Sequence, residues 1–503
     1  MSAKSLTADQ AIGIGGGAPP MASSNKDGAS MPQRKERNNP AVAAIWFGAS
    51  VYLNSALLFF ATPIFTRLMS TAEYGEVTLY TSWSVVLGVF ATLSLSTGIF
   101  NTAMLEFGDD LDAYISSMLG LTTLAVGGCG LVFALSVAVF GNYTGVRESL
   151  LSYMFVYFVF NAAFLFWQSR ERFFFRYKAV SAISIPSSVI GVGGAIYLML
   201  MPATAHIKVE LRVAVATLPI LVCGLALYAV LLKKGARVFC RKYWAYALAL
   251  SIPLIPHYLA QAFLQQFDRF AIQHYLGKSS VGIYGLAMAV ASGLTLFWTA
   301  INSSWVPWML KKFAASAYDE VFQKTGILIT GIGLLCVIGG LVAPEAIRLL
   351  APPRFQEAAL VTPGLLLASY FQFCQSLYLI VQFYKKRTSM ITACSVLAAM
   401  LSIALNILLL PHFGVVGSSF VIAFCQAFQL VFHGWVVQRT DGLEVIARRK
   451  LMAISGSVIT LSILAIACAD FPLVRLPIAG VLLAYGLFLG AQQFRRQQMS
   501  RLS

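Results

Sequence analysis

The sequence is poor in charged residues, and this scarcity argues against a water-soluble fold. Asp, Glu, Lys and Arg make up 11% of the 503 residues, whereas soluble domains carry about 25%. Hydrophobic residues make up 58%, so this chain could not cover a folded surface with polar groups. The composition therefore predicts an integral membrane protein.

The sequence also lacks the motifs of several kinds of functional site. The eight cysteines form no CxxC pair, which argues against a disulfide framework or a zinc site. The glycine cluster at 13–17 follows no predicted strand, so it does not indicate a phosphate-binding loop. The loops between apolar runs are too short for a catalytic or nucleotide-binding domain. The enzyme-like fragment Asp110-Leu111-Asp112 is therefore interpreted as a solvated acidic loop, and we expect no catalytic residue, metal or cofactor.

Long apolar runs are abundant. Each is about 20 residues or longer, the length that a helix needs to cross ~30 Å of hydrocarbon. The pattern predicts an all-α protein with fourteen membrane-spanning helices, at residues 41–66, 77–100, 114–141, 150–168, 180–201, 211–232, 244–267, 281–306, 325–347, 358–384, 389–410, 415–437, 451–469 and 473–493.

Basic residues alternate between the two sides of this arrangement. With the N-terminus on the inside, 27 of the 36 Lys and Arg residues lie in inside segments, as expected for cytoplasmic loops. The net charge of +16 then lies beside anionic headgroups, so the expected partners are membrane lipids and not nucleic acid. Both termini are predicted to be cytoplasmic. Nine basic residues fall outside: Arg67, Arg147, Lys208, Arg212, Arg269, Lys278, Arg348, Arg354 and Arg475.

A weak internal repeat indicates the architecture. RLMSTAEYGEVTLY after the first apolar run resembles HYLGKSSVGIYGLA after the seventh, and aligns Gly75 with Gly282. An even number of helices lies between them, so the copies run parallel. This predicts a disordered cytoplasmic tail at 1–39, six-helix lobes at 40–232 and 244–437, and two extra helices at 451–493. Met1 and Met31 are both candidate starts.

Several segments resemble a known transporter family. FDRFAIQHYLGKSSVGIYGLA (267–287), NSSWVPWM (302–309), NILLLPHFGVVGSSF (406–420) and the TRLMSTAEYGE exit of the first helix are similar to signature stretches of the Wzx-like polysaccharide flippases. These belong to the multidrug/oligosaccharidyl-lipid/polysaccharide (MOP) exporter superfamily.

The resemblance implies two six-helix lobes in a bacterial inner membrane, often with two extra helices. It implies movement of undecaprenyl-pyrophosphate-linked oligosaccharides from the cytoplasmic to the periplasmic leaflet, with coupling to a proton or sodium gradient. The product would be an exopolysaccharide, a capsule or the O-antigen of lipopolysaccharide, and partners would include a polysaccharide polymerase and export proteins.

The predicted helix 244–267 and the residues that follow it are rich in polar groups. Pro253 and Pro256 remove backbone donors, so we expect a bend near the midplane. Arg269 is a candidate for the substrate pyrophosphate, or else it forms an interfacial pair with its neighbour, near the outer edge of the membrane. Four residues share a stripe at i, i+4, i+8 and i+11 spacing: His257, Gln261, Gln265 and Asp268.

Candidate roles follow from side-chain chemistry. Arg269, Arg67, Asn54, Gln261, Gln265 and Asn302 are candidate substrate-binding residues in a cationic, amide-lined cleft. Asp268 and His257 are candidates for ion coupling. For the amides and His257 the alternative is packing between helices, and for Arg67 it is an interfacial anchor.

Two other functions remain open at this point. A drug/cation antiporter of the same superfamily would favour acidic and aromatic residues in the cleft. A membrane-embedded polysaccharide polymerase or ligase would need a long external loop with basic and catalytic residues, and the external loops here are short.

Overall fold

The structure is a bundle of helices. The computed structural model describes residues 40–96, 98–315, 317–385, 387–442 and 444–502, so the tail expected at 1–39 lies outside the described residues. No strand occurs in these ranges. The helices are α1 (Pro40–Leu68), α2 (Thr71–Thr92), α3 (Gly98–Glu106), α4 (Leu111–Phe140), α5 (Glu148–Phe173), α6 (Tyr177–Met199), α7 (Lys208–Glu210), α8 (Ala216–Gly235), α9 (Arg241–Ser251), α10 (Ile255–Leu276), α11 (Lys278–Ala314), α12 (Tyr318–Leu350), α13 (Ala358–Tyr384), α14 (Thr388–Asp441), α15 (Arg448–Ala467) and α16 (Pro472–Leu502).

Helix α14 is a hairpin of two membrane-crossing segments. Its 54 residues would extend about 80 Å if straight, far more than a bilayer core of ~30 Å. The chain reverses at Gly414, whose φ of 60° and ψ of −157° suit glycine. The Arg387 guanidinium and the Asp441 carboxylate, at opposite ends of α14, lie 3.0 Å apart. The two predicted helices at 389–410 and 415–437 are therefore confirmed.

The predicted number of crossings agrees with the structure. Twelve described segments are long and apolar enough to span a membrane. Counting α14 as two crossings, and adding the less apolar 22-residue α2, gives fourteen. The all-α, polytopic fold expected from the sequence is thus confirmed.

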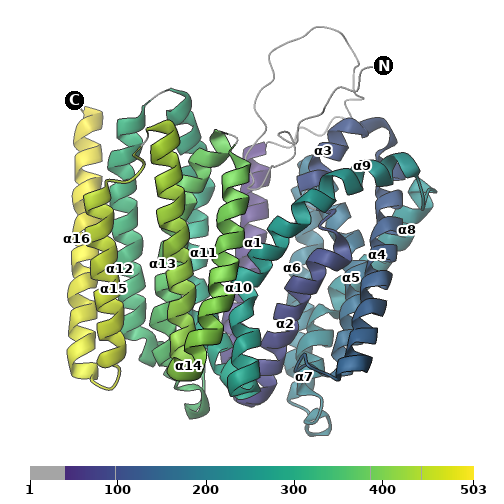
Figure 1. Ribbon diagram of the computed structural model, residues 1–503, viewed down its shortest axis with the longest axis horizontal. Coiled ribbons are helices and arrows are strands. Elements are labelled where there is room, and N and C mark those ends of the chain that lie inside the picture. Colours follow the sequence, from purple (N-terminus) through teal and green to yellow (C-terminus); the bar gives the residue numbers. More distant parts are fainter. Residues whose placement is uncertain (1–39, 97, 316, 386, 443, 503) are drawn as a thin grey trace.

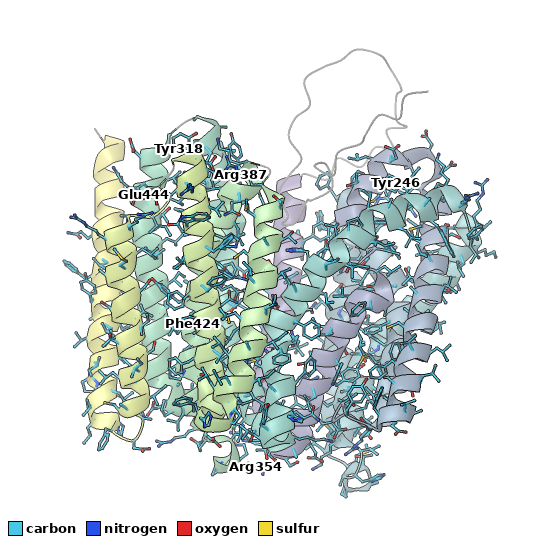
Figure 2. All side chains as sticks on the ribbon, viewed as in Figure 1. Tyr246, Tyr318, Arg354, Arg387, Phe424 and Glu444 are labelled. Atoms are coloured by element: carbon cyan, nitrogen blue, oxygen red, sulfur yellow. The ribbon has the colours of Figure 1, made fainter. Side chains whose placement is uncertain are left out.

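The helices form two groups (Figure 1). Helices α2 to α9 fill one half of the bundle and α11 to α16 fill the other, with α1 and α10 between them. Figure 2 marks the two ends of the bundle: Arg354 lies at one, and Arg387 and Glu444 lie at the other. We name these the Arg354 end and the Arg387 end. By the distribution of basic residues, the Arg354 end is the predicted periplasmic end.

The internal repeat has a direct structural counterpart. A Cβ atom on Gly75 of α2 would collide with the Lys278 carbonyl of α11, and one on Gly282 would collide with the Thr71 carbonyl. The paired positions are 207 residues apart in both cases, 75 to 282 and 71 to 278. Such reciprocal contact is what a twofold axis produces. The two copies therefore meet about a pseudo-twofold axis through the α2–α11 crossing.

The helix predicted at 244–267 is interrupted where the two prolines predicted a bend. Residues Ile252–Leu254 form a 3-10 turn between α9 and α10, where Pro253 supplies no backbone donor. Helix α9 packs on the first group, because the Trp244 indole donates to the Ser117 carbonyl at 3.0 Å. Residues 244–251, predicted as part of the second lobe, therefore contact the first.

Helix α10 continues to Leu276, nine residues beyond the predicted end at 267. Asp268 and Arg269 are consequently inside the helix and 3% exposed, whereas the sequence placed them beyond its end. The apolar run ended at 267 because these charges interrupt it. Pairing between them, described below, allows the helix to continue through the bilayer.

The C-terminal helices α15 and α16 pack on α12. Arg475 is fully buried and bonds to the Glu345 carboxylate and, at 2.8 Å, to the Leu341 carbonyl. A buried guanidinium requires such partners. The predicted extra pair of helices is thus joined to α12 by an ion pair as well as by apolar packing.

Candidate functional site

The candidate site is the contact between the two helix groups near the Arg354 end. We call it the seam and define it as α1 and α2 on one side, with α10, α11 and the α12–α13 loop on the other. Aromatic side chains pack across it: Trp83 on Phe270 with ring centroids 4.5 Å apart, and Tyr74 on Phe355 at 5.8 Å.

Helix α2 begins at the seam with a capping box. The Ser70 hydroxyl accepts from the Glu73 amide at 3.2 Å, and the Glu73 carboxylate accepts from the Ser70 amide at 2.7 Å. This reciprocal pair satisfies two donors at the helix N-terminus. The STAE sequence in the repeat thus orients α2 so that Gly75 meets α11 one turn later.

Arginines from both sides cap helix ends across the seam. The Arg67 guanidinium donates to the Leu349 carbonyl at 3.0 Å, and the Arg354 guanidinium donates to the Thr66 and Met69 carbonyls at 3.0 and 2.8 Å. Cations suit the C-terminal ends of helices, where carbonyls lack partners. Arg67, predicted as a substrate ligand or an anchor, therefore joins the end of α1 to the end of α12.

A buried carboxylate adds ionic contacts at the same end. Glu76 of α2 is 5% exposed. It accepts from the Arg147 amide at 2.9 Å and lies 3.5 Å from the Lys278 ammonium of α11. The Glu210 carboxylate, 2.5 Å from the Arg147 guanidinium, raises the pKa of Arg147. Arg147 and Lys278 together balance the negative charge of the buried Glu76 carboxylate.

Asp268 and Arg269 form a buried ion pair on α10. The guanidinium lies 2.9 Å from the carboxylate, and it also bonds to the Gln265 carbonyl and contacts the Met288 sulfur. The second carboxylate oxygen accepts from the Tyr284 hydroxyl of α11. In this conformation protein partners occupy the Arg269 guanidinium, and Arg269 does not line the cavity described below.

A second polar pair lies within α14. The Ser418 hydroxyl donates to the Asn406 amide oxygen at 2.7 Å. Sequence analysis did not identify Tyr284 and Ser418 as site residues. The available signal was that GIYG and GSSF both fall in the family-like segments.

The remaining predicted residues are spread over three helices. The Gln261 amide donates to the Ser395 hydroxyl at 2.6 Å, which joins α10 to α14. Gln265 is exposed and Asn54 is half-buried. His257 Nδ1 on α10 and Asn302 Oδ1 on α11 are enclosed without a hydrogen-bond partner among the described residues. The structure thus brings Asp268 and Arg269 together and leaves the rest apart.

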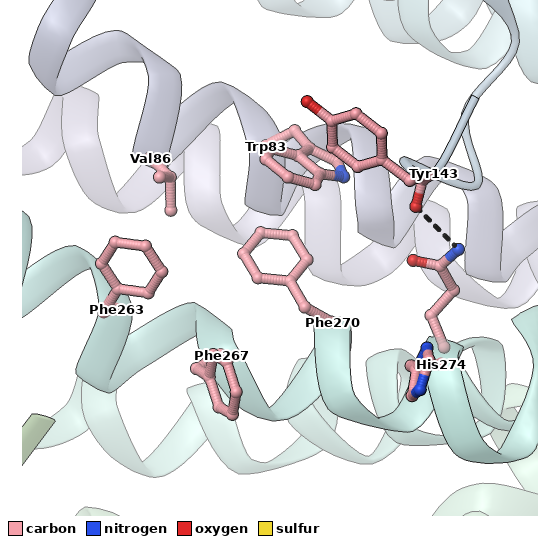
Figure 3. A pocket seen from close by; sticks show the side chains of 8 residues that line it. Trp83, Val86, Tyr143, Phe263, Phe267, Phe270 and His274 are labelled. Atoms are coloured by element: carbon pink, nitrogen blue, oxygen red, sulfur yellow. Dashed lines mark hydrogen bonds between the residues drawn. The ribbon is translucent and has the colours of Figure 1, made fainter. Parts of the chain in front are cut away.

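A cavity of 370 Å³ lies beside the seam, between α2 and α10 (Figure 3). Aromatic side chains dominate its wall, and the Gln273 amide donates to the Tyr143 carbonyl at 3.5 Å. The predicted cationic, amide-lined surface is not found in this cavity, because Arg269 and Gln261 are directed to other partners. The lining residues are Trp83, Val86, Tyr143, Phe263, Phe267, Phe270, Gln273 and His274.

The sequence matches the model of one protein family. The profile of the family described as polysaccharide biosynthesis protein matches residues 43–313, more than half of the chain. No curated protein sequence matches the chain.

Solved structures share the fold. The lipid II flippase MurJ, in an inward closed conformation, is 13% identical, with a TM-score of 0.59 over 90% of this chain and 99% of that one. A multidrug resistance MATE family transporter of the MOP superfamily, in an inward-facing conformation, is 13% identical, with a TM-score of 0.55 over 79% of this chain and 98% of that one. At these identities the likeness establishes the architecture alone.

Proposed function

Because the chain belongs to the polysaccharide biosynthesis protein family, we propose that it flips a lipid-linked oligosaccharide across the bacterial inner membrane. The substrate is an undecaprenyl-pyrophosphate-linked sugar unit, moved from the cytoplasmic to the periplasmic leaflet for an exopolysaccharide, a capsule or O-antigen. The polysaccharide polymerase and export proteins are its partners, and both termini are cytoplasmic.

The reciprocal α2–α11 crossing carries this proposal. The contacts Thr71–Gly282 and Gly75–Lys278 lie in the first turns of both helices, at the Arg354 end. Helix ends capped across the seam by Arg67 and Arg354 close the same end. Two parallel repeats that meet at one end of a seam are the arrangement from which alternating access operates. The closed end is the predicted periplasmic end, so this state would receive substrate from the cytoplasm.

Ion coupling is proposed for Asp268, with His257 as the second candidate. The Asp268 carboxylate is buried between α10 and α11 and bonds to Tyr284, so loss of its charge would change the contact between two seam helices. The His257 nitrogen is enclosed without a partner among the described residues, which leaves it free to bind a proton.

The test is flipping in proteoliposomes. A fluorescent lipid-linked oligosaccharide should cross the bilayer faster when a proton or sodium gradient is imposed. Asp268→Asn or His257→Ala should lose this acceleration and keep slow equilibration. Tyr275→Phe, a change at an exposed position of the same helix, serves as the matched comparison for expression and insertion.

Three outcomes are distinguishable. If the lipid-linked sugar is not flipped and organic cations are exported instead, the flippase proposal is wrong and the protein is a drug antiporter. Flipping that ignores both gradients would remove the coupling roles and keep the flippase. Gradient-driven flipping that survives both substitutions would place the coupling site elsewhere.

A further inference from the structure

The cavity between α2 and α10 has an aromatic wall that the fold holds in place. The Trp83 indole donates to the Thr144 carbonyl at 3.1 Å. Its ring packs on Phe270, with centroids 4.5 Å apart, and edge-on against Tyr143 at 6.0 Å. A hydrogen bond and two ring contacts thus fix the orientation of Trp83, and the cavity is preformed, as ligand pockets usually are.

The polarity of the lining changes along the cavity. On α10 the lining residues run from Phe263 through Phe267 and Phe270 to Gln273 and His274 (Figure 3). The two ends of this row are eleven positions apart, which is ~17 Å along a helix. Because α10 ends two residues after His274, at the Arg354 end, the polar side chains lie at the mouth and the phenylalanines lie deeper.

This profile fits one acyl chain of a phospholipid. Half of a ~30 Å hydrocarbon core is ~15 Å, close to the length of the row on α10. A volume of 370 Å³ is near the lower end of the range for ligand pockets, so it suits a single chain and not a whole lipid. An undecaprenyl chain is far longer than one leaflet and fits this length less well.

The walls of the cavity come from opposite sides of the seam. Trp83 and Val86 belong to α2, and the three phenylalanines belong to α10. A movement that separates the two sides at the Arg354 end would pull these walls apart. A ligand that binds only the closed arrangement stabilises it by its binding free energy.

We propose that this cavity holds one acyl chain of a phospholipid from the leaflet at the Arg354 end, and that the bound chain stabilises the closed seam. The Gln273 amide and the His274 ring at the mouth supply hydrogen-bonding groups for the ester and headgroup oxygens. The inference goes beyond the proposed function, because this lipid is a resident of the membrane and not the transported substrate.

The experiment maps lipid contacts by photo-crosslinking. The purified full chain is placed in phosphatidylglycerol nanodiscs that contain a trace of phosphatidylglycerol with a diazirine midway along one acyl chain. After illumination, mass spectrometry should find adducts on Phe263 and Phe267. Val86→Phe directs a ring into the cavity and should lower these adducts about tenfold, as expected for an overpacked contact. Val85→Phe, at a 40% exposed position outside the lining, is the matched control and should not lower them.

Competition on the wild type gives a second measurement that needs no variant to fold. In detergent micelles the adducts on Phe263 and Phe267 should saturate with the photoreactive lipid, and unlabelled phosphatidylglycerol should displace it. Undecaprenyl phosphate should displace it less well. Preferential displacement by undecaprenyl phosphate would assign the cavity to the polyprenyl chain and overturn the phospholipid proposal.

A pair of glycine variants tests the link to the closed seam. Gly75→Ala places a Cβ against the Lys278 carbonyl, so it should loosen the crossing and lower the cavity adducts. Gly293→Ala, where a Cβ meets no atom within 4 Å, should leave them at the wild-type level. Unchanged adducts in Gly75→Ala would refute the effect on the seam.

The remaining outcome concerns ordinary lipid contact. Adducts that do not saturate in the wild type, and that are equal in Val85→Phe and Val86→Phe, would show only the general lipid layer around the protein and overturn the site. Flipping of the lipid-linked oligosaccharide is measured separately, so none of these results decides the proposed function.

Discussion

At the scale of single residues, partners decide what each charge can do. Arg269 was the first choice for an anion ligand because it follows a polar stripe in an apolar helix. The structure pairs it with Asp268 at 2.9 Å and encloses both. Burying one unpaired charge costs more than burying a matched pair.

The ion pair can be tested by a double-mutant cycle. Arg269→Gln should lower the free energy of unfolding by about 3–5 kcal/mol, because Asp268 is left buried and uncompensated. The double variant Asp268→Asn/Arg269→Gln should be less destabilised than the sum of its single variants. Chemical unfolding in mixed micelles gives both quantities.

The cycle also addresses the predicted role of Arg269 in transport. If Arg269 binds the substrate in another conformation, the double variant will be stable yet unable to support polymer export. If Arg269 is only structural, export will recover together with stability. Additive single effects would show that the two charges are not coupled in the folded protein.

At the scale of elements, backbone geometry determines how the helices meet. The capping box of Ser70 and Glu73 begins α2, and Gly75 then allows α2 to touch α11 through backbone atoms. Gly414 reverses α14. The 3-10 turn at Ile252–Leu254 separates α9, which packs on the first group, from α10, which packs on the second.

The α2–α11 crossing predicts that replacing either glycine of the repeat by alanine impairs the protein to the same extent. Gly75→Ala and Gly282→Ala each place a Cβ against a backbone carbonyl of the partner helix. Overpacking of this kind costs about 1–3 kcal/mol and should disfavour the state closed at the Arg354 end. Polymer export should therefore fall in both variants, measured in cells at matched expression.

Gly293, on the same helix α11, is the matched control. A Cβ there meets no atom within 4 Å, so Gly293→Ala should be neutral or slightly stabilising, as expected from helix propensity. Normal export by Gly75→Ala would contradict the functional importance of the crossing. Unequal effects at positions 75 and 282 would contradict the pseudo-twofold symmetry.

At the scale of the whole molecule, charge distribution sets orientation. Basic residues gather at the Arg387 end, where α1 begins and α16 ends (Figure 1). The Arg354 end holds fewer, and most of these have partners within the protein. Cations that remain free at the Arg387 end resist translocation and interact with anionic headgroups.

Orientation is tested by cysteine accessibility. The eight native cysteines are free thiols, so they are first replaced. Single cysteines at Ser279 and at Thr388 should then react oppositely with an impermeant thiol reagent: the first in intact cells, the second only after permeabilisation. Equal labelling of both positions in intact cells would refute the predicted topology.

The sequence by itself determined the membrane-spanning class, the fourteen crossings and the repeat. These depend on the length of apolar runs and the distribution of charge along the chain, which are one-dimensional quantities. It also predicted the bend at Pro253, since proline acts locally. The sequence-based prediction ended the seventh helix too early. The linear sequence does not reveal that Asp268 and Arg269 form an ion pair within the fold.

Only the tertiary structure decided which polar side chains have hydrogen-bond or ion-pair partners within the protein. Arg354 meets Thr66 and Met69 from nearly 290 positions away along the chain, and no local pattern encodes such a contact. The energy of a buried charge depends on the distance to its nearest counter-charge or carbonyl. That distance is a property of packing, and it is why Arg67 and Arg269 have protein partners that the sequence did not reveal.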